Sequence, residues 1–188
     1  MRKILNKFIE LYNKGKTFEE ISENIFLNYS ATKDNDLIYE MKKKISQEFS
    51  VDLMHIHLIG SSHTGFSKDF IEKDGKDYDF CIIDHFIFEK LLLKVKTENI
   101  NKENIKKKFY ENLSNGKLHY CYIDNELKQE LKNKLEQIRI ELKIDKEISI
   151  CFYISEKAFI KILSNFLEKK WIGTKTSGRT TIELLERI

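Results

Sequence analysis

The feature of this sequence that most constrains its fold is the interleaving of two hydrophobic periodicities. Segments with apolar residues at three- and four-residue spacing alternate along the 188 residues with short apolar runs. The first pattern predicts amphipathic helices and the second predicts buried strands. Helices and strands that alternate in this way pack in layers on a sheet. We therefore expect an α/β (α+β) fold, with a mixed central sheet flanked by helices.

The N-terminal part of the chain, about residues 1–50, predicts helices. An apolar stripe runs through residues 4–12 and ends before Gly15. A second helix begins at Thr17, which has capping-box spacing with Glu20, and a third is expected over about 36–49. No glycine- or serine-rich linker, low-complexity tract or internal repeat divides the chain. We therefore expect one domain over residues 1–188, with an N-terminal helical segment.

The rest of the chain predicts strands at 53–59, 78–83 and 118–123, with helices at 86–95, 102–113 and from 126 onward. Residues 138–144 are ambiguous. They could continue the helix that begins near 126, yet apolar residues at 138, 140, 142 and 144 alternate strictly with polar ones. Because such alternation favours a strand, we interpret 138–154 as a β-hairpin that turns at 145–147. A helix over about 155–169 and a short element at 181–188 follow.

Composition and charge exclude several classes of protein. The formal net charge is only +3, which does not by itself indicate a nucleic-acid-binding protein. The densest basic run, 102–108, is interpreted as an exposed helix face, and the alternative is a surface that attracts phosphate. No apolar run approaches the roughly 20 residues that span a bilayer, so no membrane partner is expected. The N-terminus lacks the apolar core of a signal peptide, which predicts a cytoplasmic (or nuclear) protein. Cys81, Cys121 and Cys151 are widely spaced and predict free thiols.

The residues that could carry chemistry lie between 58 and 83. Gly60 and Ser61 end one predicted strand, and the next strand carries Asp77 and Asp79. Residues two apart on a strand share a face, so both carboxylates point to the same side. Such a pair is unfavourable unless a cation neutralises it, and Mg²⁺ favours sites built from carboxylates and substrate phosphates. Gly60 lets a phosphate approach the backbone, and Ser61 offers a hydroxyl and an amide donor.

The run Gly60–Phe66 followed by Asp77–Cys81 resembles the signature of the nucleotidyltransferase superfamily, which has the DNA polymerase beta-like fold. The motif is similar in particular to that of terminal RNA nucleotidyltransferases and non-canonical poly(A) polymerases. The loop between its two halves is longer than is usual in the family, and the resemblance is confined to residues 58–83.

The resemblance implies a nucleotidyltransferase fold and a metal-dependent reaction. In that reaction a nucleoside monophosphate moves from a nucleoside triphosphate to an acceptor, which could be an RNA end, a protein or a small molecule. The implied nucleotide-binding residues are Gly60, Ser61, Thr64 and Gly65. The implied catalytic ligands of Mg²⁺ (or Mn²⁺) are Asp77 and Asp79.

The family also uses a third carboxylate, which lies on a later strand, binds the metal and activates the acceptor hydroxyl. The layout of residues 138–159 is similar to the hairpin and following helix of these enzymes. The resemblance therefore implies Glu141 as the third catalytic and metal-binding residue. Asp124, at the end of the predicted strand 118–123, is the rival for this position.

Two other interpretations of the sequence stay open. The chain could be a catalytically degenerate nucleotidyltransferase-fold module that acts by binding or regulation. It could also be an unrelated α/β domain whose acidic pair only lies on the surface. No feature of the sequence specifies the acceptor, the preferred base or an oligomeric state.

Overall fold

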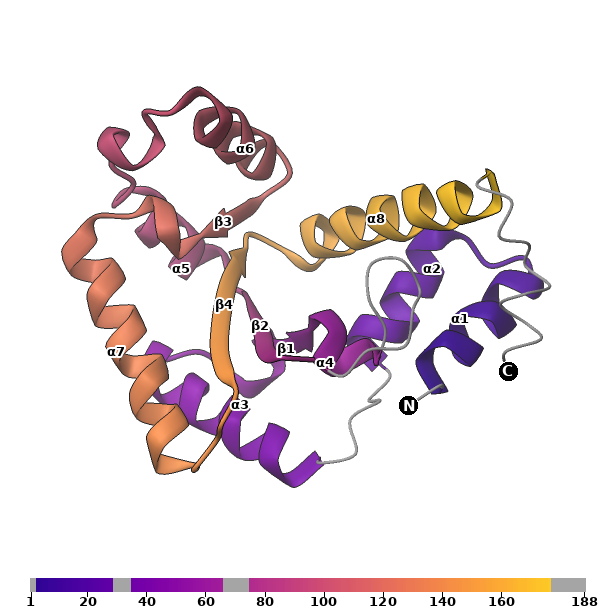
Figure 1. Ribbon diagram of the computed structural model, residues 1–188, viewed down its shortest axis with the longest axis horizontal. Helices are drawn as coiled ribbons and strands as arrows, with labels where there is room; N and C mark the ends of the chain where they lie inside the picture. Colours follow the sequence, from indigo (N-terminus) through magenta and orange to yellow (C-terminus); the bar gives the residue numbers. More distant parts are fainter. Residues whose placement is uncertain (1–2, 29–34, 66–74, 177–188) are drawn as a thin grey trace.

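The computed structural model describes residues 3–28, 35–65 and 75–176. Within these residues the chain forms a four-stranded mixed sheet in the order β1-β2-β4-β3, with helices on both faces (Figure 1). The strands are β1 (Ile56–Ile59), β2 (Asp77–Ile83), β3 (Lys117–His119) and β4 (Glu147–Tyr153). β2 and β4 are parallel, whereas β1 pairs with β2 and β3 with β4 in antiparallel fashion. The predicted mixed sheet flanked by helices is confirmed.

One face of the sheet is entirely apolar. On it, Phe80 and Ile82 of β2 lie beside Ile150 and Phe152 of β4, and all four side chains are buried. This face packs against α3 (Asn35–Phe49), α5 (His85–Leu92), α6 (Glu103–Ser114) and α7 (Asn125–Glu141). Figure 1 shows α5, α6 and α7 on one side of β4 and α8 on the other. Burial of this face fixes which way the residues between these positions point.

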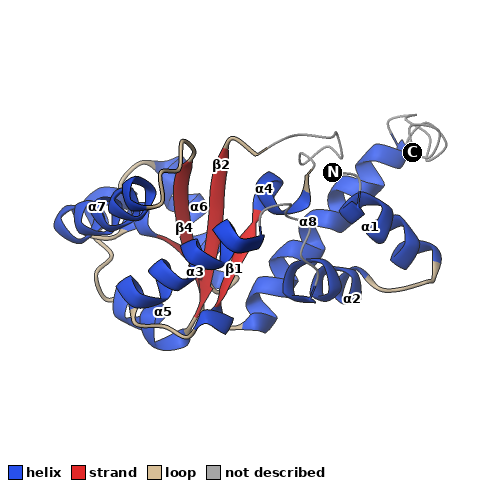
Figure 2. Cartoon of the chain, turned by 90° about the horizontal axis from the view of Figure 1, so that it is seen from below, coloured by secondary structure: helices blue, strands red, loops and turns tan. Residues whose placement is uncertain are grey.

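The opposite face is apolar over only half of its length. Cys81, Ile83, Cys151 and Tyr153 pack there against the second group of helices. That group comprises α1 (Lys3–Asn13), α2 (Phe18–Glu23) with the π-helical turn η1 (Asn24–Asn28), and α8 (Glu156–Thr176), on the other side of the sheet in Figures 1 and 2. The first residues of β2 and β4 on this same face are polar and partly exposed. The candidate functional site lies on this polar half.

The N-terminal helices form for the reasons that the sequence gives. The Thr17 hydroxyl accepts from the Glu20 amide, and the Glu20 side chain accepts from the Thr17 amide, so the predicted capping box is confirmed. α1 is held by its buried stripe: the Phe8 ring meets that of Trp171 on α8 edge-on, with centroids 4.9 Å apart. Aromatic pairs of this kind add to the burial of apolar area.

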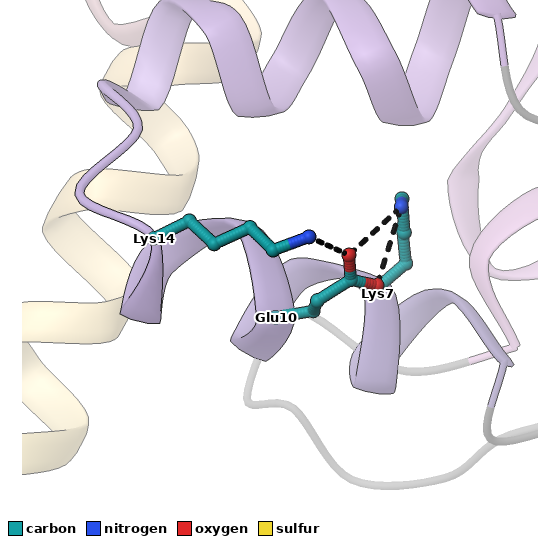
Figure 3. Close-up of polar contacts among 3 residues, drawn as sticks. All are labelled: Lys7, Glu10 and Lys14. Carbon is teal, nitrogen blue, oxygen red and sulfur yellow. Dashed lines mark hydrogen bonds and ion pairs between the residues drawn. The ribbon is translucent and has the colours of Figure 1, made fainter.

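The outer side of α1 carries only surface ion pairs. Glu10 lies between Lys14, at 2.6 Å, and Lys7, at 3.2 Å (Figure 3). The hydrogen bonds from Lys14 and then Lys7 lower the pKa of the Glu10 carboxyl. Exposed pairs of this kind contribute little to stability, so packing rather than charge holds α1 in place.

The predicted hairpin at 138–154 is wrong in its first strand. Residues 138–141 are the last turn of α7, and the chain then leaves the helix at Lys143, which has a φ of 53°. The helical spacing prevails because Leu131, Leu135 and Ile138 form one buried stripe. Ile140 is 65% exposed, so the alternation of residues 138–144 does not correspond to burial.

Two other predicted strands are shorter than expected. Residues 53–55 form a 3₁₀ turn, η2 (Leu53–His55), before β1, and residues 120–122 form a second one, η4 (Tyr120–Tyr122), after β3. The element predicted at 181–188 lies outside the described residues. No helix in the described segments is long and apolar enough to cross a membrane.

Candidate functional site

Asp77 and Asp79 lie at the start of β2 and share the partly polar face of the sheet. Their register partners on the parallel strand β4 are Glu147 and Ser149. Because paired residues of adjacent strands point to the same side, these four side chains form one polar surface, which we call the acidic face. The two aspartates share a face, as alternation along a strand predicts, and Phe80 is buried on the other face.

The Asp79 carboxylate is partly buried on the acidic face and accepts a hydrogen bond there. Ser149 Oγ donates to Asp79 Oδ1 at 2.5 Å. Partial burial raises the pKa of Asp79, the Ser149 hydrogen bond opposes this, and the charge of Asp77 adds to the rise. A carboxylate that is poorly hydrated and lies beside a second carboxylate gains free energy when a cation binds.

The turn after β1 lies directly against Asp79. Ile59, the last residue of β1, is the register partner of Asp79, and Gly60 follows with a φ of +70°. A Cβ added at Gly60 would lie 2.6 Å from Asp79 Oδ2. Both the backbone angle and the close approach therefore require glycine here. The structure thus brings the predicted Gly60-Ser61 turn and the predicted Asp79 together.

The other predicted nucleotide-binding residues belong to the short helix α4 (Gly60–Thr64) and its end. Thr64 is buried, and its hydroxyl donates to the Gly60 carbonyl at 3.0 Å. Gly65 ends the helix in the left-handed conformation, and its amide donates to the Ser61 carbonyl at 2.8 Å. Ser62 Oγ donates to the carbonyl of Asp77, which ties the helix to β2. Thr64 and Gly65 therefore shape the turn that presents Gly60 and Ser61.

The predicted position of Glu141 is wrong. It was expected on a strand, but it lies at the C-terminal end of α7, where Lys44 of α3 pairs with it at 2.7 Å. Since α7 packs on the apolar face of the sheet, Glu141 does not belong to the acidic face. Its rival Asp124 is the N-cap of α7, where it accepts from the Leu127 amide at 2.9 Å. Neither residue lies on a strand.

The residues that the sequence analysis missed are Glu147 and Ser149. Their signal is the alternation of polar residues with buried Ile148 and Ile150 at the start of β4, which mirrors the start of β2. The hairpin interpretation of 138–154 places residues 145–147 in a turn, so it does not identify this alternation as the start of a strand. Glu147 is exposed and lies opposite Asp77 in the register.

The donor set of the acidic face fits a metal that is shared with a substrate. In the described residues, no group of three or more His, Cys, Asp or Glu side chains is arranged to hold a metal ion. Two carboxylates on one face still match Mg²⁺, which usually binds one or two protein carboxylates together with substrate phosphates. Asp77 and Asp79 are therefore the candidate ligands, and a phosphate beside Gly60 would supply further oxygens.

Comparisons with known proteins do not identify a family. No protein-family model matches the chain, and no curated protein and no solved structure matches it either. The function is therefore argued from the residues of the acidic face and of the turn beside it.

Proposed function

We propose that this protein is a metal-dependent nucleotidyltransferase with the DNA polymerase beta-like fold. It would transfer a nucleoside monophosphate from a nucleoside triphosphate to an acceptor. The observation that carries the proposal is the close approach of Gly60 to the Asp79 carboxylate. Two features that the sequence offers separately, a phosphate-holding turn and a carboxylate pair, meet at one point of the fold. Phosphoryl-type transfer needs both, because its catalysis is mainly positioning and charge stabilisation.

The reaction assigns a role to each of these residues. Asp77 and Asp79 would hold Mg²⁺, which supplies neutralising charge for the triphosphate. The Gly60-Ser61 turn binds phosphate oxygens through its main chain and the Ser61 hydroxyl. Ser149 holds Asp79 Oδ1, so that Oδ2 stays turned toward Gly60. These contacts position the α-phosphorus for in-line attack.

The transfer step also needs a proton acceptor. The acceptor hydroxyl attacks the α-phosphorus, the bond from that phosphorus to the bridging oxygen of the β-phosphate breaks, and pyrophosphate leaves. Glu147 takes the place that Glu141 was expected to fill: it is an exposed carboxylate opposite Asp77 on the same face. We assign it the role of accepting the hydroxyl proton.

The direct test is transfer of label from each α-labelled nucleoside triphosphate, with Mg²⁺ or Mn²⁺, to total RNA and to cell lysate as acceptors. Asp79→Ala is expected to abolish transfer and metal-dependent triphosphate binding. Glu147→Gln is expected to reduce transfer while it leaves triphosphate binding in place. Asp52→Asn is the matched control, because Asp52 is an exposed aspartate whose side chain makes no capping bond.

The outcome that overturns the proposal is equally concrete. If the wild-type protein transfers no label and binds no triphosphate with either metal, the catalytic assignment fails. The interpretation of the chain as a binding or regulatory module then remains. Thermal denaturation of each variant shows whether a loss comes from the site or from the fold.

A further inference from the structure

The outer side of α5 exposes apolar side chains that do not contribute to the core. Phe86, in the first turn, is 72% exposed, and Leu93, the C-cap, is 85% exposed. Leu93 keeps helical backbone angles, so these two residues, seven positions apart, lie on one side of the helix about two turns apart. Phe88 and Leu91, on the inner side, are buried in the core. α5 is therefore apolar on two sides, although a surface helix normally has one apolar side.

Between its two apolar ends, the outer side of α5 carries one acidic and one basic residue. Glu89 and Lys90 follow Phe86 by three and four positions, and both are exposed. Residues at this spacing share one side of a helix, so the order along that side is apolar, acidic, basic, apolar. We call Phe86, Glu89, Lys90 and Leu93 the α5 face.

A third exposed apolar side chain lies near the N-terminal end of the α5 face. The turn η2 lies beside the start of α5, because His55 Nδ1 is 3.2 Å from Oδ2 of Asp84, the N-cap of α5. Met54 of η2 is 78% exposed. Met54, Phe86 and Leu93 are the most exposed large hydrophobic side chains in the part of the chain that the structure describes. Exposed apolar groups that gather in one region, instead of scattering singly, indicate an interaction site.

The residue order of the α5 face is complementary to itself. If two α5 helices lie antiparallel about a two-fold axis between positions 89 and 90, Phe86 of each copy faces Leu93 of the other. In the same arrangement, Glu89 of each copy faces Lys90 of the other. Two apolar contacts then flank two pairs of opposite charge. A parallel arrangement would bring like charges together, which is unfavourable. Self-complementarity of this kind is what a closed two-fold dimer requires.

The α5 face is far from the acidic face. β2 begins at Asp77 and ends at Ile83, directly before the N-cap of α5. Its seven residues span about 20 Å at about 3.3 Å per residue. Figure 2 accordingly shows α4 near one end of the strands and α5 near the other. Two copies that meet at α5 therefore leave both acidic faces uncovered.

We propose that the α5 face is an isologous interface between two copies of this chain, in which the two α5 helices pack antiparallel. Phe86 and Leu93 supply the apolar contacts, and Glu89 with Lys90 fixes the direction and register of the helices. The interface is small, because it consists of one short helix with the neighbouring turn η2, so the dimer is weak and forms at micromolar concentration. This proposal does not depend on the proposed function.

The test measures the mass of the full chain by sedimentation velocity at about 1–100 μM, the range in which small interfaces dissociate. The wild type is expected to pass from monomer to dimer over this range. Phe86→Ala and Leu93→Ala each affect two contacts of the dimer and are each expected to weaken dimerisation at least about tenfold. Ile140→Ala is the matched control, because Ile140 is an exposed apolar residue of another helix, α7, and it is expected to leave dimerisation unchanged.

Reversal of the two charges tests the antiparallel register itself. Lys90→Glu brings two pairs of like charge together across the two-fold axis and is expected to weaken dimerisation at least about tenfold. Glu89→Lys combined with Lys90→Glu makes both pairs opposite again and is expected to restore dimerisation to within about twofold of the wild type. Lys169→Glu changes the net charge equally at an exposed position of α8 and is expected to have no effect. Thermal denaturation verifies that each variant keeps the fold.

Four results would overturn the proposal. A wild type that stays monomeric over the whole range has no such interface, whether or not the α5 face captures another protein. A dimer that Phe86→Ala and Leu93→Ala leave unchanged forms through a different surface. A dimer that Lys90→Glu and Lys169→Glu weaken equally responds only to net charge. If the double charge reversal fails to restore a dimer that Lys90→Glu weakens, the helices do not pack in the antiparallel register.

Discussion

Substitution of Gly60 by alanine tests the geometry on which the site depends. Gly60 has a φ of +70°, and a Cβ there would lie 2.6 Å from Asp79 Oδ2. Gly15, which follows α1, provides a matched control. Its φ is +73°, but a Cβ there would meet no atom within 4 Å. The two alanine variants therefore share the backbone cost and differ in the contact with Asp79.

The expected magnitudes follow from these two terms. A non-glycine residue in the left-handed conformation costs about 1–2 kcal/mol, part of which is offset by the stiffer unfolded chain. We therefore expect Gly15→Ala to lower the free energy of unfolding by about 1 kcal/mol. Gly60→Ala must also displace the Asp79 carboxylate by roughly 1 Å and weaken its bond to Ser149, which adds about 1 kcal/mol or more.

Denaturant titration measures the stability of both variants, and each 1 kcal/mol corresponds to a shift in Tm of about 2–4 °C for a chain of this size. Metal-dependent triphosphate binding is measured in parallel. It is expected to be lost in Gly60→Ala and to be unchanged in Gly15→Ala. If the two variants have equal stability and equal triphosphate binding, the close approach of Gly60 to Asp79 has no role and the argument for the site fails.

Three further predictions concern residues outside the acidic face. Burial lowers the pKa of His57 to about 4, below the unfolded value of about 6.5, so the stability that neutral His57 contributes is complete above pH 6.5 and is lost as the pH falls toward 4. Denaturation of the wild type and of His57→Phe at each pH measures this contribution. Between pH 7 and pH 5 the variant is expected to lose about 1–2 kcal/mol less stability than the wild type. Glu141→Ala breaks an exposed ion pair with Lys44 and is expected to leave label transfer and Tm unchanged. A loss of transfer would show that Glu141 does belong to the catalytic site. Phe159→Ala empties a fully buried site and is expected to cost about 3–5 kcal/mol, whereas Phe166→Ala at a 38% exposed position is expected to cost far less; similar losses would contradict the assigned core.

Local sequence signals were sufficient where one segment determines its own structure. The capping box of Thr17 and Glu20 is present, and the strand predicted at 78–83 forms as β2, because caps and alternation act within a few residues. The hairpin prediction failed because residues 138–144 satisfy two periods at once. What decides between the two is whether Ile140 is buried, and this depends on α7 packing as a whole against the sheet.

The same dependence on packing explains why half of the acidic face was not predicted. The motif places Asp77 and Asp79 on one strand, but their neighbours on β4 follow from the register between two strands that are more than sixty residues apart. That register is set by burial, because Ile150 lies opposite Phe80, and Phe152 opposite Ile82, in the apolar core. A shift by one residue would bring these side chains to the polar side and remove Ser149 from Asp79. The core on one face of the sheet therefore determines which side chains meet on the other. A substitution that disturbs the packing of Ile150 or Phe152 is expected to weaken the hydrogen bond from Ser149 to Asp79, although neither residue contacts that carboxylate directly.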